Sequence, residues 1–197
     1  MKNKFLIIFS LIGIAGLSRL LPHPWNFTPM TGITLISASL VNTRWKSFLL
    51  PLLVWIITDH LVNMLIYNKG LLDFSYFFTT TSLGVYVSMA LIWAVGSWLR
   101  TNIRVSSVLA ASLSSSLIFY LVSNTFVFIG NPFYSQDVNG WLKCLAMGIP
   151  FYKSNFGIFF GSFFFNGILG DLFYTGLLFS AYSLLVNKSL RLIKLRP

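Results

Sequence analysis

The sequence predicts an all-α integral membrane protein with a single domain over residues 1–197, and three observations predict it. Hydrophobic residues make up 56% of the chain and charged residues only 9%, whereas about a quarter of a soluble domain is charged. The mean hydropathy is +0.78. Apolar runs of about 17 to 25 residues, long enough for a helix to cross a bilayer, recur along the whole chain.

Six apolar runs, separated by prolines, glycines and charged residues, predict six transmembrane helices. They cover about residues 5–21, 28–42, 47–67, 75–98, 105–129 and 157–186. The second run is short, since its residues rise only about 22 Å against a hydrocarbon core of about 30 Å. We therefore expect the proline-rich segment before it to fold into the protein. The sixth run is long and rich in glycine, which favours a tilted or broken helix.

The distribution of Lys and Arg predicts the orientation of these helices. With the amino terminus inside the cell, ten basic residues fall in inner segments and four in outer segments, which is a clear positive-inside bias. The outer four are Arg19, Lys69, Lys143 and Lys153. We expect a multi-pass protein of the inner (cytoplasmic) membrane with both termini cytoplasmic. Its first helix should be an uncleaved anchor, because Ile14-Ala15-Gly16 makes a poor signal-peptide cleavage site.

Polar residues gather at one depth, in the outer half of the predicted bundle. The third helix carries Asp59, His60 and Asn63 near its outer end, and the fourth opens with Tyr76 and several hydroxyl residues. The fifth places Asn124 at the same depth. Because such groups are costly when they face lipid, we expect them to face one another or an outward-facing pocket of ligand size.

The candidate substrate-binding residues are His23, Trp25, Asn26, Asp59, His60, Tyr76, Asn124, Trp141 and Asp171. The two tryptophans and the tyrosine would stack on a planar ligand, and Asp59, Asn124 and Asn26 would hydrogen-bond to it. The pocket wall would include the proline-rich segment 19–30, helices three to five and the loop over 130–156. Segment 19–30 is alternatively a rigid corner between two helices.

Several of these residues have a second interpretation. Asp59 either contacts a substrate or a cation, with His60 as a donor, or pairs with a basic loop residue such as Arg19 or Lys69. Asp171 either contacts the ligand or couples helices, for example by a hydrogen bond to a serine of the fifth helix. Asn124 either faces the pocket or holds helices together, as polar side chains commonly do in membranes.

The sequence lacks the common catalytic motifs of several enzyme classes. It contains no glutamate and therefore no HExxH motif, and its single cysteine, Cys144, excludes a CxxC site. A GxSxG nucleophile motif and a P-loop are absent, so we expect neither a hydrolase nor an ATPase. A membrane enzyme using Asp59 and His60 is the remaining enzymatic alternative. The net charge of +10 is spread between apolar runs, so it reports topology and does not indicate binding to nucleic acid.

Four stretches together resemble a family of uncharacterised small bacterial membrane proteins grouped with the S components of energy-coupling factor (ECF) transporters. They are RLLPHPWNFTPM at 19–30, SLIFYLVSNTFVF at 116–128, GWLKCLAMGIPFY at 140–152 and GILGDLFYTGLLF at 167–179. Their order and the six-helix layout match over nearly the whole chain. The positions that coincide with the family's motif are Pro24, Asn26, Phe27, Pro29, Asn124 and Asp171.

The resemblance implies an S-component-like bundle that captures a vitamin or similar nutrient from outside. Its partners would be a membrane T subunit and cytoplasmic ATPases, and it would topple in the bilayer to release its cargo. If cobalamin were the substrate, Cys144, His23 and His60 would be candidate cobalt ligands; we expect no resident cofactor or metal.

Two features depart from the family's pattern. The first helix offers Gly13, Ala15 and Gly16 in place of the AxxxA motif used for docking, and residues 153–166 look inserted. The alternative function is a structural or assembly subunit, similar to a cell-shape protein, without a transported ligand.

Overall fold

The computed structural model describes residues 2–149 and 162–194. Over these residues the chain forms helices and connecting segments, with no strand. The α-helices of the described residues are α1 (Lys2–Leu17), α2 (Met30–Leu40), α3 (Arg44–Leu65), α4 (Thr80–Leu99), α5 (Val105–Phe128), α6 (Val138–Met147) and α7 (Phe163–Lys194). Two short 3-10 helices, η1 (Ser18–Leu20) and η2 (Ser75–Phe78), precede the segments that lead into α2 and α4.

Within the described part of the chain, four helices are long and apolar enough to cross a membrane. They are α3, α4, α5 and the Phe163–Val186 part of α7. Leucines on all four, such as Leu53, Leu91 and Leu177, are exposed, which suits a lipid-facing surface. The chain therefore has the character of a multi-pass helical membrane protein. α1 and α2 are shorter, with 16 and 11 residues, so length and apolar character alone support four of the six expected crossings.

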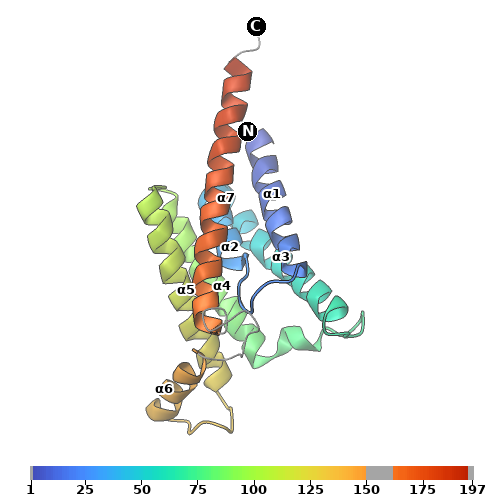
Figure 1. Ribbon diagram of the computed structural model, residues 1–197, viewed down its shortest axis with the longest axis vertical. Coiled ribbons are helices and arrows are strands. Elements are labelled where there is room, and N and C mark those ends of the chain that lie inside the picture. Colours follow the sequence, from blue (N-terminus) through green and yellow to red (C-terminus); the bar gives the residue numbers. More distant parts are fainter. Residues whose placement is uncertain (1, 150–161, 195–197) are drawn as a thin grey trace.

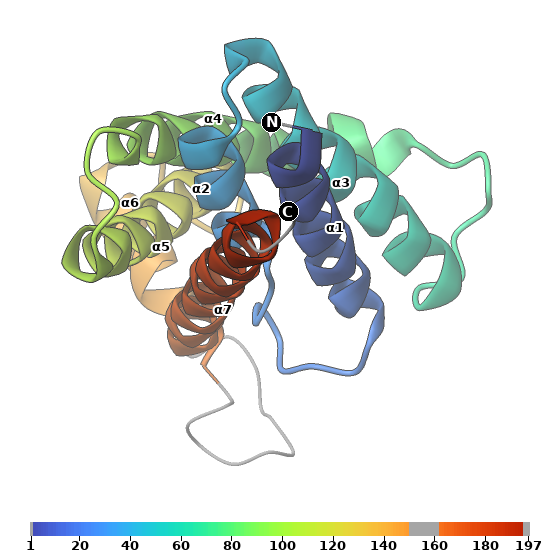
Figure 2. The same cartoon turned by 90° about the horizontal axis from the view of Figure 1, so that it is seen from above.

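The short helix α2 lies in the centre of the bundle. Every residue from Thr31 to Ser39 is buried, and α2 contacts α1, α3, α4, α5 and α7. Figure 2 shows α2 enclosed by these neighbours when the molecule is seen from above. A helix of about 16 Å is thus accommodated inside protein, where it does not need to match the bilayer thickness. Its N-cap, Pro29, is also buried, so the proline-rich segment dips inward as the sequence predicts.

Glycines allow α2 to pack closely against two of its neighbours. A β-carbon on Gly32 of α2 would lie 3.0 Å from the backbone nitrogen of Thr175 on α7. One on Gly96 of α4 would lie 3.1 Å from the Cα of Leu35 on α2. The centre of the bundle is therefore built by backbone packed on backbone, which is typical of helix contacts in membranes.

Arg100 connects the end of α4 to the end of α2, at the end of the bundle where α1 begins. Its Nε donates to the carbonyl oxygen of Ala38 at 2.6 Å, and its Nη2 donates to that of Val41 at 2.6 Å. These contacts satisfy carbonyl groups that the end of α2 leaves without helical partners. The α2–α3 and α4–α5 connections lie at this same end, and α6 lies at the opposite end (Figure 1).

The fourth and last predicted helices differ in detail from the structure. The run predicted over 75–98 is divided, because η2 ends at Phe78 and α4 begins only at Thr80. Thr79 caps α4, its hydroxyl accepting from the backbone nitrogen of Ser82 at 3.1 Å. α7 is continuous from Phe163, so the break considered for the last helix is absent from that range, while the predicted start at 157 lies outside the described residues.

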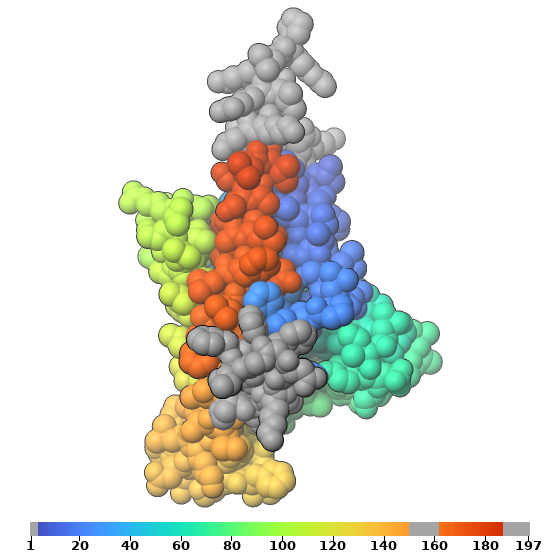
Figure 3. Space-filling view, in the orientation of Figure 1, coloured from blue at the N-terminus to red at the C-terminus, as the bar shows by residue number. Residues whose placement is uncertain are grey.

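The segment after α5 contains a further short helix, α6. Its N-cap is Asp137, which accepts a hydrogen bond from the backbone nitrogen of Gly140 at 2.7 Å. This bond, with a second from Ser135, holds the pKa of the Asp137 carboxyl below its ordinary value. α6 packs on the end of α5 and projects from the bundle, as does the segment after α3 on the other side (Figure 3).

Candidate functional site

A cavity of about 370 Å³ lies among the helices at the end of the bundle nearer α6. Its walls come from the segment before α2, the starts of α2, α4 and α7, and the later parts of α3 and α5. Ligand pockets in proteins commonly measure about 300–1,000 Å³, so this cavity is of a size to hold a small organic molecule.

Hydroxyl groups and aromatic rings form most of the cavity wall. The hydroxyl residues include Thr31 and Thr34 of α2, Ser82 of α4 and Ser116 of α5. The aromatic residues are Trp55, Tyr76, Phe119, Tyr120, Phe163 and Phe164. Such a wall offers flat apolar surface together with donors and acceptors at fixed positions, which is the usual composition of a small-molecule site.

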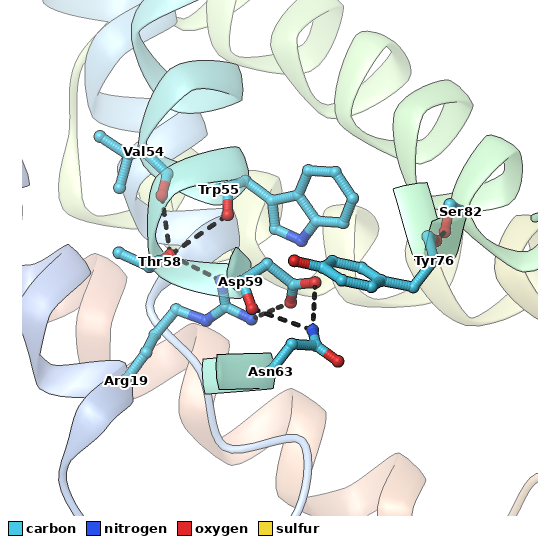
Figure 4. A network of polar contacts seen from close by, with 8 residues as sticks. All are labelled: Arg19, Val54, Trp55, Thr58, Asp59, Asn63, Tyr76 and Ser82. Atoms are coloured by element: carbon cyan, nitrogen blue, oxygen red, sulfur yellow. Dashed lines mark hydrogen bonds and ion pairs between the residues drawn. The ribbon is translucent and has the colours of Figure 1, made fainter. Parts of the chain in front are cut away.

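An ion pair stands on one side of the cavity. Arg19, in η1, donates from Nη2 to Asp59 Oδ1 at 2.9 Å and from Nη1 to the Thr58 hydroxyl at 2.7 Å. Asn63, one turn along α3, donates to Asp59 Oδ2 at 3.2 Å. The side chains of Arg19 and Asp59 are 11% and 22% exposed, and both line the cavity. Figure 4 shows this network beside the rings of Trp55 and Tyr76.

Asp59 thus takes the paired arrangement, with Arg19 as the partner that the sequence offered. The guanidinium reaches from η1 to α3, so the ion pair joins two elements as well as bordering the cavity.

Asp171 of α7 stands on another wall. The hydroxyl of Ser116 on α5 donates to its Oδ2 at 2.6 Å, and the side chain of Thr31 on α2 is a further hydrogen-bonding partner. The residue is 7% exposed and lines the cavity. The interhelical hydrogen bond to the fifth helix is therefore confirmed, and the same carboxylate borders the space available to a ligand.

The second half of segment 19–30 forms part of the cavity wall. Asn26 lines the cavity, and its Nδ2 donates to the carbonyl oxygen of Phe163 at 3.0 Å. Its φ of +62° is in the left-handed region, which asparagine tolerates better than most residues. Phe27 then packs on Phe173 and Tyr174 of α7, with ring centroids 5.7 Å apart in both pairs. The segment is consequently docked on α7.

Between Arg19 and Asn26, residues 20–25 of this segment lie outside the cavity lining. His23 and Trp25 do not line the cavity, and Trp25 is 48% exposed. The His23 ring nitrogen Nδ1 lies 2.9 Å from the carbonyl oxygen of the next residue, Pro24.

Tyr76 lines the cavity, and His60 lies behind it. His60 Nδ1 is 2.5 Å from the Tyr76 hydroxyl, and its ring stacks on Phe74 with centroids 4.9 Å apart. Burial, and secondly the charge of Asp59, raise the pKa of the Tyr76 hydroxyl above its ordinary value. Tyr76 therefore presents a neutral hydroxyl and a flat ring, and His60 acts on the cavity only through it.

Asn124 and Trp141 lie between α5 and α6, away from the cavity lining. Asn124 Nδ2 donates to the carbonyl oxygen of Tyr120 at 2.8 Å, within α5. Trp141 Nε1 donates to the Thr125 hydroxyl at 3.0 Å, which attaches α6 to α5. Asn124 thus takes the helix-joining arrangement, because a β-carbon on Gly148 at the end of α6 would lie 2.6 Å from its Oδ1.

Cys144 is buried at the same interface. Its Sγ lies 3.6 Å from the Asn124 carbonyl oxygen, and burial raises the pKa of its thiol. Across the described ranges, no three side chains among His, Cys, Asp and Glu gather at a potential metal site. His23, His60 and Cys144 therefore do not form a shared ligand set.

Several wall residues were not among the candidates from the sequence. Arg19 was considered as an outer basic residue and a possible partner of Asp59 but not as a substrate-binding residue, and Trp55 and Thr34 were not singled out. On α5, Ser116, Phe119 and Tyr120 recur at the spacing of one helix face, which is a signal that could have placed them together.

The family model described as "Family of unknown function (DUF6580)" matches residues 1–193. No curated protein and no solved structure matches the chain.

Proposed function

We propose that this chain, which belongs to that family of unknown function, binds a small organic molecule in the cavity beside Asp59 and Asp171. The observation that carries the proposal is the cavity itself: it has the volume of a ligand site and is lined by aromatic rings and hydroxyl groups from five helices. Isolated polar groups at membrane depth are costly, so a cavity that collects them favours a ligand-binding role.

The specific form of the proposal is a substrate-binding component of an ECF-type transporter. The molecule would be a vitamin or vitamin-like nutrient, and the cavity would open to the outside of the inner membrane. The basic residues of the α2–α3 and α4–α5 connections lie at the opposite end of the bundle, which agrees with a cytoplasmic position for that end.

Docking to a T subunit would use the outer face of α1. Gly16 is occupied in α1–α3 packing, because a β-carbon there would lie 2.6 Å from Val54 Cγ1, and Ala15 is buried. Gly13 has nothing within 4 Å of its added β-carbon, and Phe9 and Ile14 near it are exposed. A partner helix would therefore approach α1 at Gly13.

Native mass spectrometry of the protein purified from its source in a mild detergent tests the proposal. We expect a bound small molecule of fixed mass, released on unfolding, together with thermal stabilisation of the emptied protein by that compound. An unliganded protein that no member of a vitamin panel stabilises would contradict the proposal.

A structural or assembly subunit is the second candidate. It is favoured by the internal pairing of Asp59 with Arg19 and of His60 with Tyr76, and by the use of Asn124 between α5 and α6. Such a subunit would purify with a protein partner and without a small molecule, so the same preparation distinguishes the two functions.

A further inference from the structure

The charges on the cavity wall suggest what kind of molecule it accepts, and this inference rests on the proposed function. Of the described residues that line the cavity, three carry a full charge in their ordinary ionised states: Arg19, Asp59 and Asp171. Arg19 and Asp59 neutralise each other at 2.9 Å. The remaining ionisable group of the described wall is the Asp171 carboxyl group, whose ionised form a positive charge in the cavity would stabilise.

Asp171 is surrounded by neutral partners. The Ser116 hydroxyl, on α5, and the Thr31 side chain, on α2, are its hydrogen-bonding groups. Among the described residues the ion pair between Arg19 and Asp59 is the only one, so no described basic side chain pairs with Asp171. A carboxylate that is 7% exposed and lacks a counter-charge is expensive in a membrane protein. The cavity beside it is where a counter-charge can enter.

Aromatic rings lie along the same two helix faces. Tyr120 follows Ser116 by one turn of α5, and Phe164 precedes Asp171 by about two turns of α7, or about 10 Å. The ring centroids of Tyr120 and Phe164 are 4.6 Å apart, and both residues line the cavity. A ligand extending from Asp171 along α7 would therefore meet an aromatic surface, which also attracts cations through the ring faces.

We propose that the ligand is a compact organic cation, with an ammonium or protonated ring nitrogen beside Asp171 and an apolar or planar body against Tyr120 and Phe164. The ligand nitrogen donates to the carboxylate and supplies the missing positive charge. Ser116 and Thr31 hold the carboxylate in place. The hydroxyl residues of α2 and α4 are available to polar substituents of the ligand.

Three probes that share one skeleton test this preference: 4-phenylbutylammonium, the neutral 4-phenyl-1-butanol and the anionic 5-phenylpentanoate. Each is titrated by calorimetry into the ligand-free protein in nanodiscs of zwitterionic lipid. We expect the cation to bind about ten to a hundredfold more tightly than the alcohol, the range of a hydrogen bond to a charged group, and the anion to bind most weakly. Equal or tighter binding of the alcohol or the anion, or no binding of the cation, would overturn the inference.

Asp171→Asn supplies the matched variant, because its amide oxygen still accepts from Ser116 while the charge is removed. The cation should lose its advantage over the alcohol in this variant and keep it in Asp73→Asn, the same change at a residue outside the cavity lining. If the cation still binds more tightly than the alcohol in Asp171→Asn, the proposal is contradicted. If that variant does not fold, the three probes on the unaltered protein still decide it. Equal binding of cation and alcohol leaves the proposed function standing, whereas failure of every probe together with the absence of a co-purified compound removes both.

Discussion

At the scale of single residues, the interaction between Arg19 and Asp59 is open to direct measurement. Their atoms are 2.9 Å apart, the partners come from η1 and α3, and both are largely shielded from solvent. We expect a double-mutant cycle with Arg19→Ala and Asp59→Ala to give a coupling free energy of about 1–3 kcal/mol, because removing one partner leaves the other charge uncompensated. The free energy of unfolding in mixed micelles is the quantity to compare.

The matched control is the cycle of Lys69→Ala with Asp73→Ala, two opposite charges in the exposed segment after α3. That pair should show little coupling, since exposed ion pairs are weak. Additive effects in the Arg19–Asp59 cycle would mean that the pair contributes nothing to the junction of η1 and α3.

Tyr76 provides a second residue-scale prediction. Tyr76→Phe keeps the ring on the cavity wall but removes the hydroxyl that lies 2.5 Å from His60 Nδ1. We expect a loss of about 1 kcal/mol in the free energy of unfolding and little change in affinity for a stacked ligand. His60→Ala should produce a similar loss of stability. A large loss of affinity in Tyr76→Phe with unchanged stability would show instead that the hydroxyl contacts the ligand.

The end of the bundle at which a polar residue lies could be predicted from the sequence, but the direction of its side chain could not. Asn26, Asp59, Tyr76 and Asp171 line the cavity, as residues of the expected pocket should. Asn124 lies toward the same end of the bundle yet is held between α5 and α6. Polar and apolar residues are mixed around α5, so no polar stripe indicates which face points inward.

At the scale of elements, close contacts at glycine hold the proline-rich segment against α7. A β-carbon on Gly170 would lie 2.9 Å from the Cα of Phe27, whereas one on Gly176, on the same helix, would meet nothing within 4 Å. We expect Gly170→Ala to destabilise the protein by about 1–3 kcal/mol and to weaken ligand binding, because the cavity wall at Asn26 must move. Gly176→Ala should be neutral or slightly stabilising.

Thermal unfolding and ligand affinity measured on both variants check this prediction. Equal effects of the two substitutions would show that segment 26–29 is free to shift without cost.

The positions of helices were predictable where the apolar runs are long, and less so where a local hydrogen bond decides the residue at which a helix begins. α3, α4 and α5 lie where their runs predict them to within a few residues, apart from the start of α4. That start depends on the Thr79 cap, a single hydroxyl contact within a run of similar residues. The shortness of the second run predicted that the segment before α2 folds into the protein. α2 is buried because a helix too short for the bilayer is accommodated where protein surrounds it.

At the scale of the whole molecule, the charge distribution predicts which end of the bundle faces the cytoplasm. The chain has one cysteine, Cys144, which is buried, so a single substitution removes the native thiol and introduced thiols can be labelled alone. Leu72, 85% exposed in the segment between α3 and α4, and Asn102, exposed in the α4–α5 connection, lie at opposite ends of the bundle. In a Cys144→Ala background, a membrane-impermeant maleimide should label Leu72→Cys in intact cells and Asn102→Cys only after lysis. The reverse pattern would invert the orientation and place the cavity on the cytoplasmic side.

The presence of a ligand in the cavity is the central claim, and an experimental structure of the protein purified with its co-purified compound tests it most directly. We expect non-protein density between α3, α5 and α7, in contact with Tyr76 and Asp171. A cavity closed by its own side chains, or density bound only on the outer surface of the helices, would contradict the account.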